Sequence, residues 1–183
     1  IYGHATFRPK SNGKLNLGIA INSPYGGGSL WPEEWKGQFI SQEFNFESLF
    51  IHPTWALRIN DQWGIGMGIS AGIVTLFSRR AIDIDGLQNS RGSVRFSGQG
   101  TALGLNLGLF YKPDPNLSFG LNIRTPMPVS ISEGQTTFEV PLSRAEEYLP
   151  RPFSTPFTLP GEINLGLGYY AEERLLLTFD LNL

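Results

Sequence analysis

The stretch WGIGMGISAGIVTLF, residues 63–77, decides the fold class of this chain. Its fifteen residues are fewer than the roughly 20 that a membrane-spanning helix needs. Glycines at 64, 66, 68 and 72 would also weaken a helix. With a period of two, however, the odd-numbered residues from Trp63 to Phe77 form a mainly large, apolar face, and the even-numbered residues from Gly64 to Gly72 form a face of glycine and serine. The stretch therefore predicts a β-strand with one apolar face.

The same alternation recurs along the rest of the chain. It is regular in five further segments and rougher in a sixth: 15–22, 103–111, 117–124, 163–170, 175–182 and 49–59. Repeated alternation of this kind is typical of half-buried antiparallel strands. The sequence thus predicts an all-β protein, folded as an antiparallel up-and-down meander.

Composition narrows the class of protein. Charged residues make up only 16% of the 183 residues, against 40% hydrophobic and 13% aromatic residues, whereas soluble domains carry about 25% charged residues. The net charge of −2 argues against nucleic acid as a partner. Because the chain has no cysteine, disulfides, thiolate metal sites and a cysteine nucleophile are excluded. The remaining classes are a soluble β protein and a membrane β-barrel.

The lengths of the connections favour the barrel. Short connections are expected at 60–62, 112–116 and 171–174, and long ones at 23–37, 79–98 and 132–156. The two kinds alternate along the chain, so in a meander they lie at opposite ends, as in outer-membrane barrels. Four aromatic residues on the apolar face also lie near short turns, as expected of an aromatic girdle at a membrane surface: Trp63, Tyr111, Phe119 and Tyr169.

Several blocks of sequence resemble the FadL-type outer-membrane transporters of long-chain fatty acids and aromatic hydrocarbons. A glycine-alternating strand runs into Asn-Ser-Pro-Tyr-Gly, an Ile-x-Pro…Asn-Asp hairpin follows, and Leu-Pro later leads into Leu-Gly-x-Gly-Tyr. The blocks occur in the family's order: LNLGIAINSPYG (15–26), SLFIHPTWALRINDQWGIGMGISA (48–71), GLNLGLFYKPDPNLSFGLNIRTP (104–126) and FTLPGEINLGLGYY (157–170).

The resemblance implies a fourteen-stranded barrel in the bacterial outer membrane, with an N-terminal hatch and a wall opening at a kinked strand. Pro53 and the pair Pro126/Pro128 are candidates for such an irregularity. About seven or eight strands are expected here, and no segment matches the hatch. We therefore expect residues 1–183 to form a single β-barrel domain, incomplete at both ends, from the central part of a longer chain.

Apolar residues on the otherwise polar interior face are the first candidate ligand-binding set. They are Phe50, Leu76, Phe110 and Tyr170. Such a patch would suit an acyl chain or an aromatic ring. The alternative, equally weighted, is packing against the hatch.

Polar residues with the same interior parity form a second set. Arg58, Arg124 and Asp180 either pair with one another or steer a carboxylate head group through the barrel; mutual pairing is the favoured alternative. His52 also has interior parity, where we expect a hydrated polar side chain.

Apolar residues in the expected external loops form the third set. They are Leu30, Trp31, Trp35, Phe39, Phe138, Leu142 and Phe153. Loops that face water usually avoid such residues, so these either pack on one another, which is the default, or receive an apolar ligand.

The sequence thus predicts a passive outer-membrane channel for hydrophobic small molecules such as long-chain fatty acids. The expected partners are that ligand and membrane lipid, and a protein at the cell surface is an alternative partner. The main alternative is a structural or partner-docking barrel, and a soluble lipid-binding β protein is a third. We expect no enzyme activity, cofactor or metal, because His4 and His52 are far apart and no residue set suggests catalysis.

Overall fold

The computed structural model describes residues 2–9, 13–84, 91–171 and 175–183, so residues 172–174 of the expected 171–174 turn lie outside it. These residues form one antiparallel sheet of eleven strands and a short 3-10 helix, Leu142–Arg144. The strands are β1 (Tyr2–Phe7), β2 (Leu15–Asn22), β3 (Gly26–Leu30), β4 (Glu43–Arg58), β5 (Trp63–Asp83), β6 (Arg91–Asp114), β7 (Leu117–Arg124), β8 (Met127–Glu139), β9 (Arg151–Leu159), β10 (Glu162–Ala171) and β11 (Leu175–Asn182).

The eleven strands occupy eight positions in the sheet, because three positions are interrupted. Strands β2 and β3 both pair with β4, and β7 and β8 both pair with β6. At the next position β9 pairs with β8 and β10 pairs with β7. The order is therefore β1, β2/β3, β4, β5, β6, β7/β8, β9/β10, β11. The predicted meander of about seven or eight strands is confirmed.

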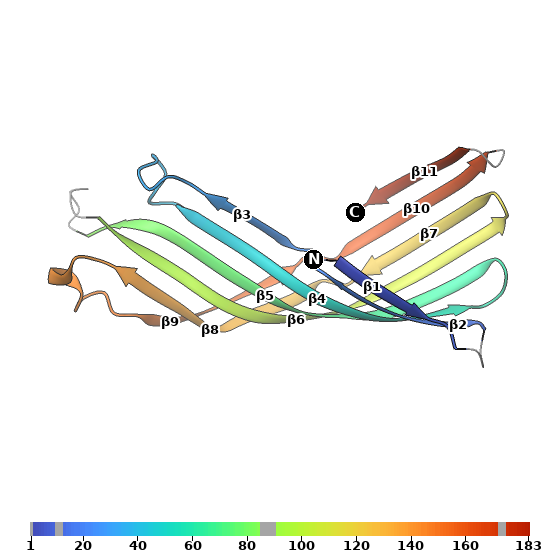
Figure 1. Ribbon diagram of the computed structural model, residues 1–183, viewed down its shortest axis with the longest axis horizontal. Helices are drawn as coiled ribbons and strands as arrows, with labels where there is room; N and C mark the ends of the chain where they lie inside the picture. Colours follow the sequence, from blue (N-terminus) through green and yellow to red (C-terminus); the bar gives the residue numbers. More distant parts are fainter. Residues whose placement is uncertain (1, 10–12, 85–90, 172–174) are drawn as a thin grey trace.

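The sheet bends at its middle into two arms (Figure 1). Strands β3, β5 and β8 end at the tip of one arm, which we call the long-loop end. Strands β4, β6 and β10 end at the tip of the other arm, the short-turn end. The predicted separation of long and short connections is thus confirmed, and the three interruptions lie near the bend.

The predicted bounds of the long connections are wrong, because the strands extend into them. Strand β3 lies within 23–37, β5 and β6 take up most of 79–98, and β8 and β9 take up most of 132–156. Outer-face residues there are charged and form ion pairs, such as Arg95–Glu139 at 2.7 Å. Beyond the apolar band that faces lipid, the outer face does not require apolar residues. The alternation that marks a strand therefore disappears, although the strands continue to pair.

The two faces of the sheet differ as the alternation predicts. Residues paired across antiparallel strands point to the same face, and the large apolar side chains gather on one of them, the outer face. There Met67 is 59% exposed, whereas Ser70, on the opposite interior face, is fully buried. Part of the predicted girdle also forms: the rings of Trp63 and Tyr111 stack at 4.1 Å, and those of Tyr111 and Phe119 at 6.1 Å.

In the part of the chain that the structure describes, no helix has the length and apolar character needed to span a membrane.

Candidate functional site

The interior face near the long-loop end is apolar, although its residues are far apart in sequence. Its buried centre, which we call the apolar chamber, is a packed cluster of side chains: Phe50, Val74, Ala102, Met127, Val129 and Leu159, with Tyr25, Phe46 and Phe157 packed against it. The bend brings β4 and β9 face to face, so that the Phe46 and Phe157 rings meet edge-on at 5.9 Å. Apolar side chains from non-adjacent strands therefore line one continuous interior surface.

Two glycines make room for this packing. An added Cβ at Gly72 would lie 2.5 Å from the Phe50 ring, and one at Gly104 would lie 2.5 Å from Cγ of Met127. Both glycines lie on the interior face, paired with Phe50 and Ser70 respectively. Small residues on the interior side therefore allow large side chains from neighbouring strands to lie flat against the wall.

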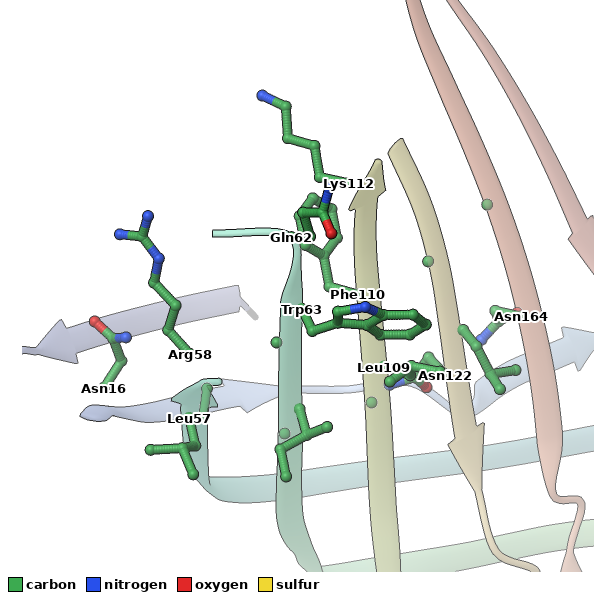
Figure 2. A pocket seen from close by; sticks show the side chains of 18 of the residues that line it. Asn16, Leu57, Arg58, Gln62, Trp63, Leu109, Phe110, Lys112, Asn122 and Asn164 are labelled. Atoms are coloured by element: carbon green, nitrogen blue, oxygen red, sulfur yellow. The ribbon is translucent and has the colours of Figure 1, made fainter. Parts of the chain in front are cut away.

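The interior face near the short-turn end forms a second zone, which we call the polar hollow. A row of paired interior residues runs across five strands there: Gly64, Phe110, Gly120, Gly166 and Asp180. With Asn16, Arg58, Asn122 and Asn164 they line a hollow of about 720 Å³. Figure 2 shows Asn122 and Asn164 on neighbouring strands, while Arg58 and Lys112 extend near the turns.

A hydrogen-bonded network lies between the two zones. Nδ1 of His52 is 2.8 Å from Oγ of Ser70, and Nε2 of His52 is 2.8 Å from Oδ1 of Asn22. Asn106 donates through Nδ2 to Oγ of Ser70 at 2.6 Å. His52 is only 8% exposed, so the expectation of a hydrated histidine is wrong. The network joins β2, β4, β5 and β6 and satisfies polar groups that the wall buries.

The first predicted set of interior residues is divided between the two zones. Phe50 is 1% exposed and lies in the apolar chamber. Leu76 is half-buried and pairs with Phe46, further toward the long-loop end. Phe110 lines the polar hollow, and Tyr170, about half exposed, pairs with Leu176 close to the short turns. The structure therefore does not bring these four residues into one patch.

The predicted polar residues are also separated. Arg58 pairs with Asp61 at 2.6 Å, and Arg124 pairs with Glu162 on the neighbouring strand β10. Asp180 lines the polar hollow that Arg58 also lines. Each arginine thus has a carboxylate partner other than Asp180, and Arg58 lines the same hollow as Asp180.

Three residues of the third predicted set do not lie in external loops. Leu30 lies in β3, Phe138 in β8 and Phe153 in β9, so these residues are in strands and not in external loops. Phe138 pairs with the buried Val94, and the Phe153 ring meets Phe96 at 5.8 Å. Both phenylalanines therefore extend the apolar interior face toward the long-loop end.

Four members of the set do lie outside the strands. The rings of Trp31 and Trp35 stack at 4.7 Å, and Nε1 of Trp35 donates to the Ser41 carbonyl at 2.7 Å. Phe39 is half-buried in the same loop. Leu142 is 94% exposed in the 3-10 helix of another loop. The loop with both tryptophans packs on itself, whereas Leu142 faces solvent.

Sequence reasoning missed four residues of the apolar interior: Tyr25, Met127, Val129 and Leu159. Met127, Val129 and Leu159 follow or precede strand interruptions at proline, where the alternation shifts by one residue. The prolines at 126 and 160 were therefore the available signal. The described residues also contain no group of three or more histidine or acidic side chains suited to a metal ion.

Comparison with known proteins gives a consistent result. The sequence model of the family described as outer membrane protein transport protein (OMPP1/FadL/TodX) matches residues 4–180. No curated protein sequence matches the chain.

Solved structures match over nearly the whole chain. A FadL homologue from Pseudomonas aeruginosa has a TM-score of 0.87 at 16% identity, covering 97% of this chain and 46% of its own. The toluene transporter TbuX from Ralstonia pickettii has a TM-score of 0.76 at 16% identity, with coverages of 99% and 53%. The toluene transporter TodX from Pseudomonas putida has a TM-score of 0.71 at 14% identity, again with 99% and 53%. At these identities the likeness concerns the fold, and the chain spans about half the length of the structures that it matches.

Proposed function

Because the chain belongs to the OMPP1/FadL/TodX family of outer membrane transport proteins, we propose that it forms part of a passive channel for hydrophobic small molecules. Long-chain fatty acids and monoaromatic hydrocarbons are the proposed substrate classes. The observation that supports this is the apolar chamber on the interior face of a wall that elsewhere lines its interior with Arg58, Asn122 and Asp180. Burial of an apolar ligand there would contribute about 0.8 kcal/mol per methylene.

The polar hollow has a complementary part in this proposal. Arg58 and Lys112 line it near the short turns, and Asn122 and Asn164 supply neutral hydrogen-bonding groups. A ligand with a carboxylate could place its acyl chain toward the apolar chamber and its head group toward Arg58. An unsubstituted hydrocarbon would use the chamber alone.

We also propose that residues 1–183 are one portion of a single barrel domain. The matched structures are about twice as long as this chain. In the described sheet, β1 and β11 stand at the two edges. Edge strands expose unpaired backbone groups, which a closed barrel would pair.

The test is equilibrium binding of oleate and of toluene to the purified full-length protein. Phe157 packs against the chamber, so Phe157→Ala is expected to weaken oleate binding roughly 10-fold or more. The matched control is Phe179→Ala, because Phe179 is 64% exposed on the outer face. Absence of binding to the unmodified protein, or equal losses in both variants, would contradict the proposal.

A second candidate function is docking of a protein partner at the cell surface. The observation in its favour is the exposure of three apolar side chains: Leu30 at the end of β3, Ile40 in the loop that follows β3, and Leu142 in the 3-10 helix that follows β8. If the protein docks a partner through this surface, Leu142→Asp should abolish retention of that partner and leave oleate binding unchanged. Retention that survives this change would count against docking through Leu142.

A further inference from the structure

The three interruptions of the wall lie at one level of the molecule. They fall at residues 23–25 between β2 and β3, at 125–126 between β7 and β8, and at 160–161 between β9 and β10. Figure 1 shows all three at the bend, between the two arms. An added Cβ at Gly161 would lie 2.8 Å from the Arg124 carbonyl and 2.9 Å from Cδ of Pro126. The second and third interruptions are thus in close contact.

Tyr25 joins the first interruption to the third across the interior. Its backbone N–H donates to Oγ of Ser48 on β4 at 3.1 Å, while its phenol donates to the Pro160 carbonyl at 2.9 Å. Four sheet positions, β4, β5, β6 and β7/β8, separate the strands that carry these two residues. A bond between such distant positions passes through the space that the sheet encloses, and not along the wall.

The Tyr25 ring is held on both sides. The Phe50 ring meets it edge-on at 6.0 Å, and the guanidinium of Arg124 lies 5.2 Å from its centre. Arg124 is itself fixed by its ion pair with Glu162. A cation over an aromatic ring is attracted by the negative charge of the ring face. The Tyr25 ring therefore contacts both Phe50 and Arg124 in its crossing position.

The position of Tyr25 coincides with the change in the chemistry of the interior. On one side lies the apolar chamber, against which Tyr25 packs. On the other side lie the interior residues of β7 and β10 that lead into the polar hollow, including Asn122 and Asn164. Tyr25 therefore lies between the apolar chamber and the residues that lead into the polar hollow.

We propose that the Tyr25 side chain forms a constriction in the channel and is a selectivity-determining residue. It excludes small hydrophilic solutes, and it yields to ligands that first occupy the apolar chamber and compete for its ring contacts. This proposal rests on the function proposed above, because it presumes that ligands move from the chamber to the hollow.

The test measures leakage of a hydrophilic probe through the full-length protein. Proteoliposomes are placed in isosmotic arabinose, and their swelling rate is followed. Tyr25→Phe removes the phenol hydrogen bond and keeps the ring, so swelling is expected to rise by about 2- to 12-fold, the equivalent of one hydrogen bond. Tyr25→Ala also removes the ring, and its swelling rate is expected to exceed that of Tyr25→Phe.

The control is Tyr111→Ala, because Tyr111 stacks on Trp63 in the outer-face girdle. That variant should swell at the unmodified rate. The Tyr25→Ala protein must first show the heat-modifiable migration of a folded barrel. If its proteoliposomes then swell no faster than those with the unmodified protein, the proposed constriction is refuted. An unchanged rate in Tyr25→Phe would refute the part assigned to the hydrogen bond.

Oleate binding by the same preparations separates this proposal from the function on which it rests. If the unmodified protein binds oleate but Tyr25→Ala does not swell faster, the result counts against the Tyr25 constriction alone. Faster swelling of Tyr25→Ala without oleate binding to the unmodified protein counts against the transport function alone.

Discussion

At the scale of single residues, the packing of side chains on the interior face depends on the positions of glycines. Gly72 leaves the space that the Phe50 ring fills, because an added Cβ would lie 2.5 Å from that ring. Gly120 is also on the interior face, yet no atom lies within 4 Å of an added Cβ there. Two glycines of the same face therefore have different structural roles.

This difference predicts unequal responses to the same substitution. Gly72→Val should lower the free energy of unfolding by about 1–3 kcal/mol, because Phe50 would be displaced from a packed position. Gly120→Val should change it by much less. Urea unfolding of the full-length protein in lipid vesicles measures both, and equal losses would show that the Phe50 packing does not depend on Gly72.

The polar network gives a second prediction at this scale. Ser70 is fully buried and bonded to both His52 and Asn106. Ser70→Ala would leave both partners without that bond inside the wall, at an expected cost of about 1–3 kcal/mol. Ser97→Ala, at an exposed outer-face position, is the matched control. Thermal unfolding that does not distinguish the two variants would contradict the network's contribution.

At the scale of the strands, depth in the membrane follows from distance along the strand. Ile69 is six residues beyond the girdle residue Trp63, or about 15 Å higher for a strand tilted by about 40°, near the middle of the hydrocarbon layer. Ser97 pairs with Phe77, which lies about 35 Å above Trp63 by the same reasoning, beyond that layer.

The two depths predict different costs for one charge. Ile69→Arg should destabilise the protein by about 2–4 kcal/mol, and Ser97→Arg by about 0–1 kcal/mol. Urea unfolding in vesicles checks both values. A cost at Ser97 as large as the cost at Ile69 would mean that β6 is still within the hydrocarbon layer at that residue.

The strands also show what the sequence could reveal. Alternation identified strands wherever the outer face meets lipid, as from Trp63 to Ile73 in β5. It failed beyond that band, where outward residues such as Arg95 and Glu139 form ion pairs on continuing strands. It also failed at Pro126 and Pro160, because each interruption shifts by one residue the positions whose side chains face the interior.

At the scale of the whole molecule, the resemblance to FadL-type transporters is confirmed by the match over residues 4–180. The candidate site was less predictable. Phe50 and Phe157 are far apart in sequence, and only the bend brings β4 and β9 together. Residue parity indicates which face a side chain occupies, but not which distant strand it meets across the interior.

The central claim is that hydrophobic ligands occupy the apolar chamber inside the wall. The most direct measurement is photolabelling of the full-length protein with a diazirine-bearing fatty acid, followed by peptide mass spectrometry. The account predicts labels in β4 and β9, at Phe46, Phe50 and Phe157, and their loss when excess oleate is added. Labels confined to outer-face residues or to exposed loop positions such as Leu142, or labels that excess oleate does not reduce, would contradict it.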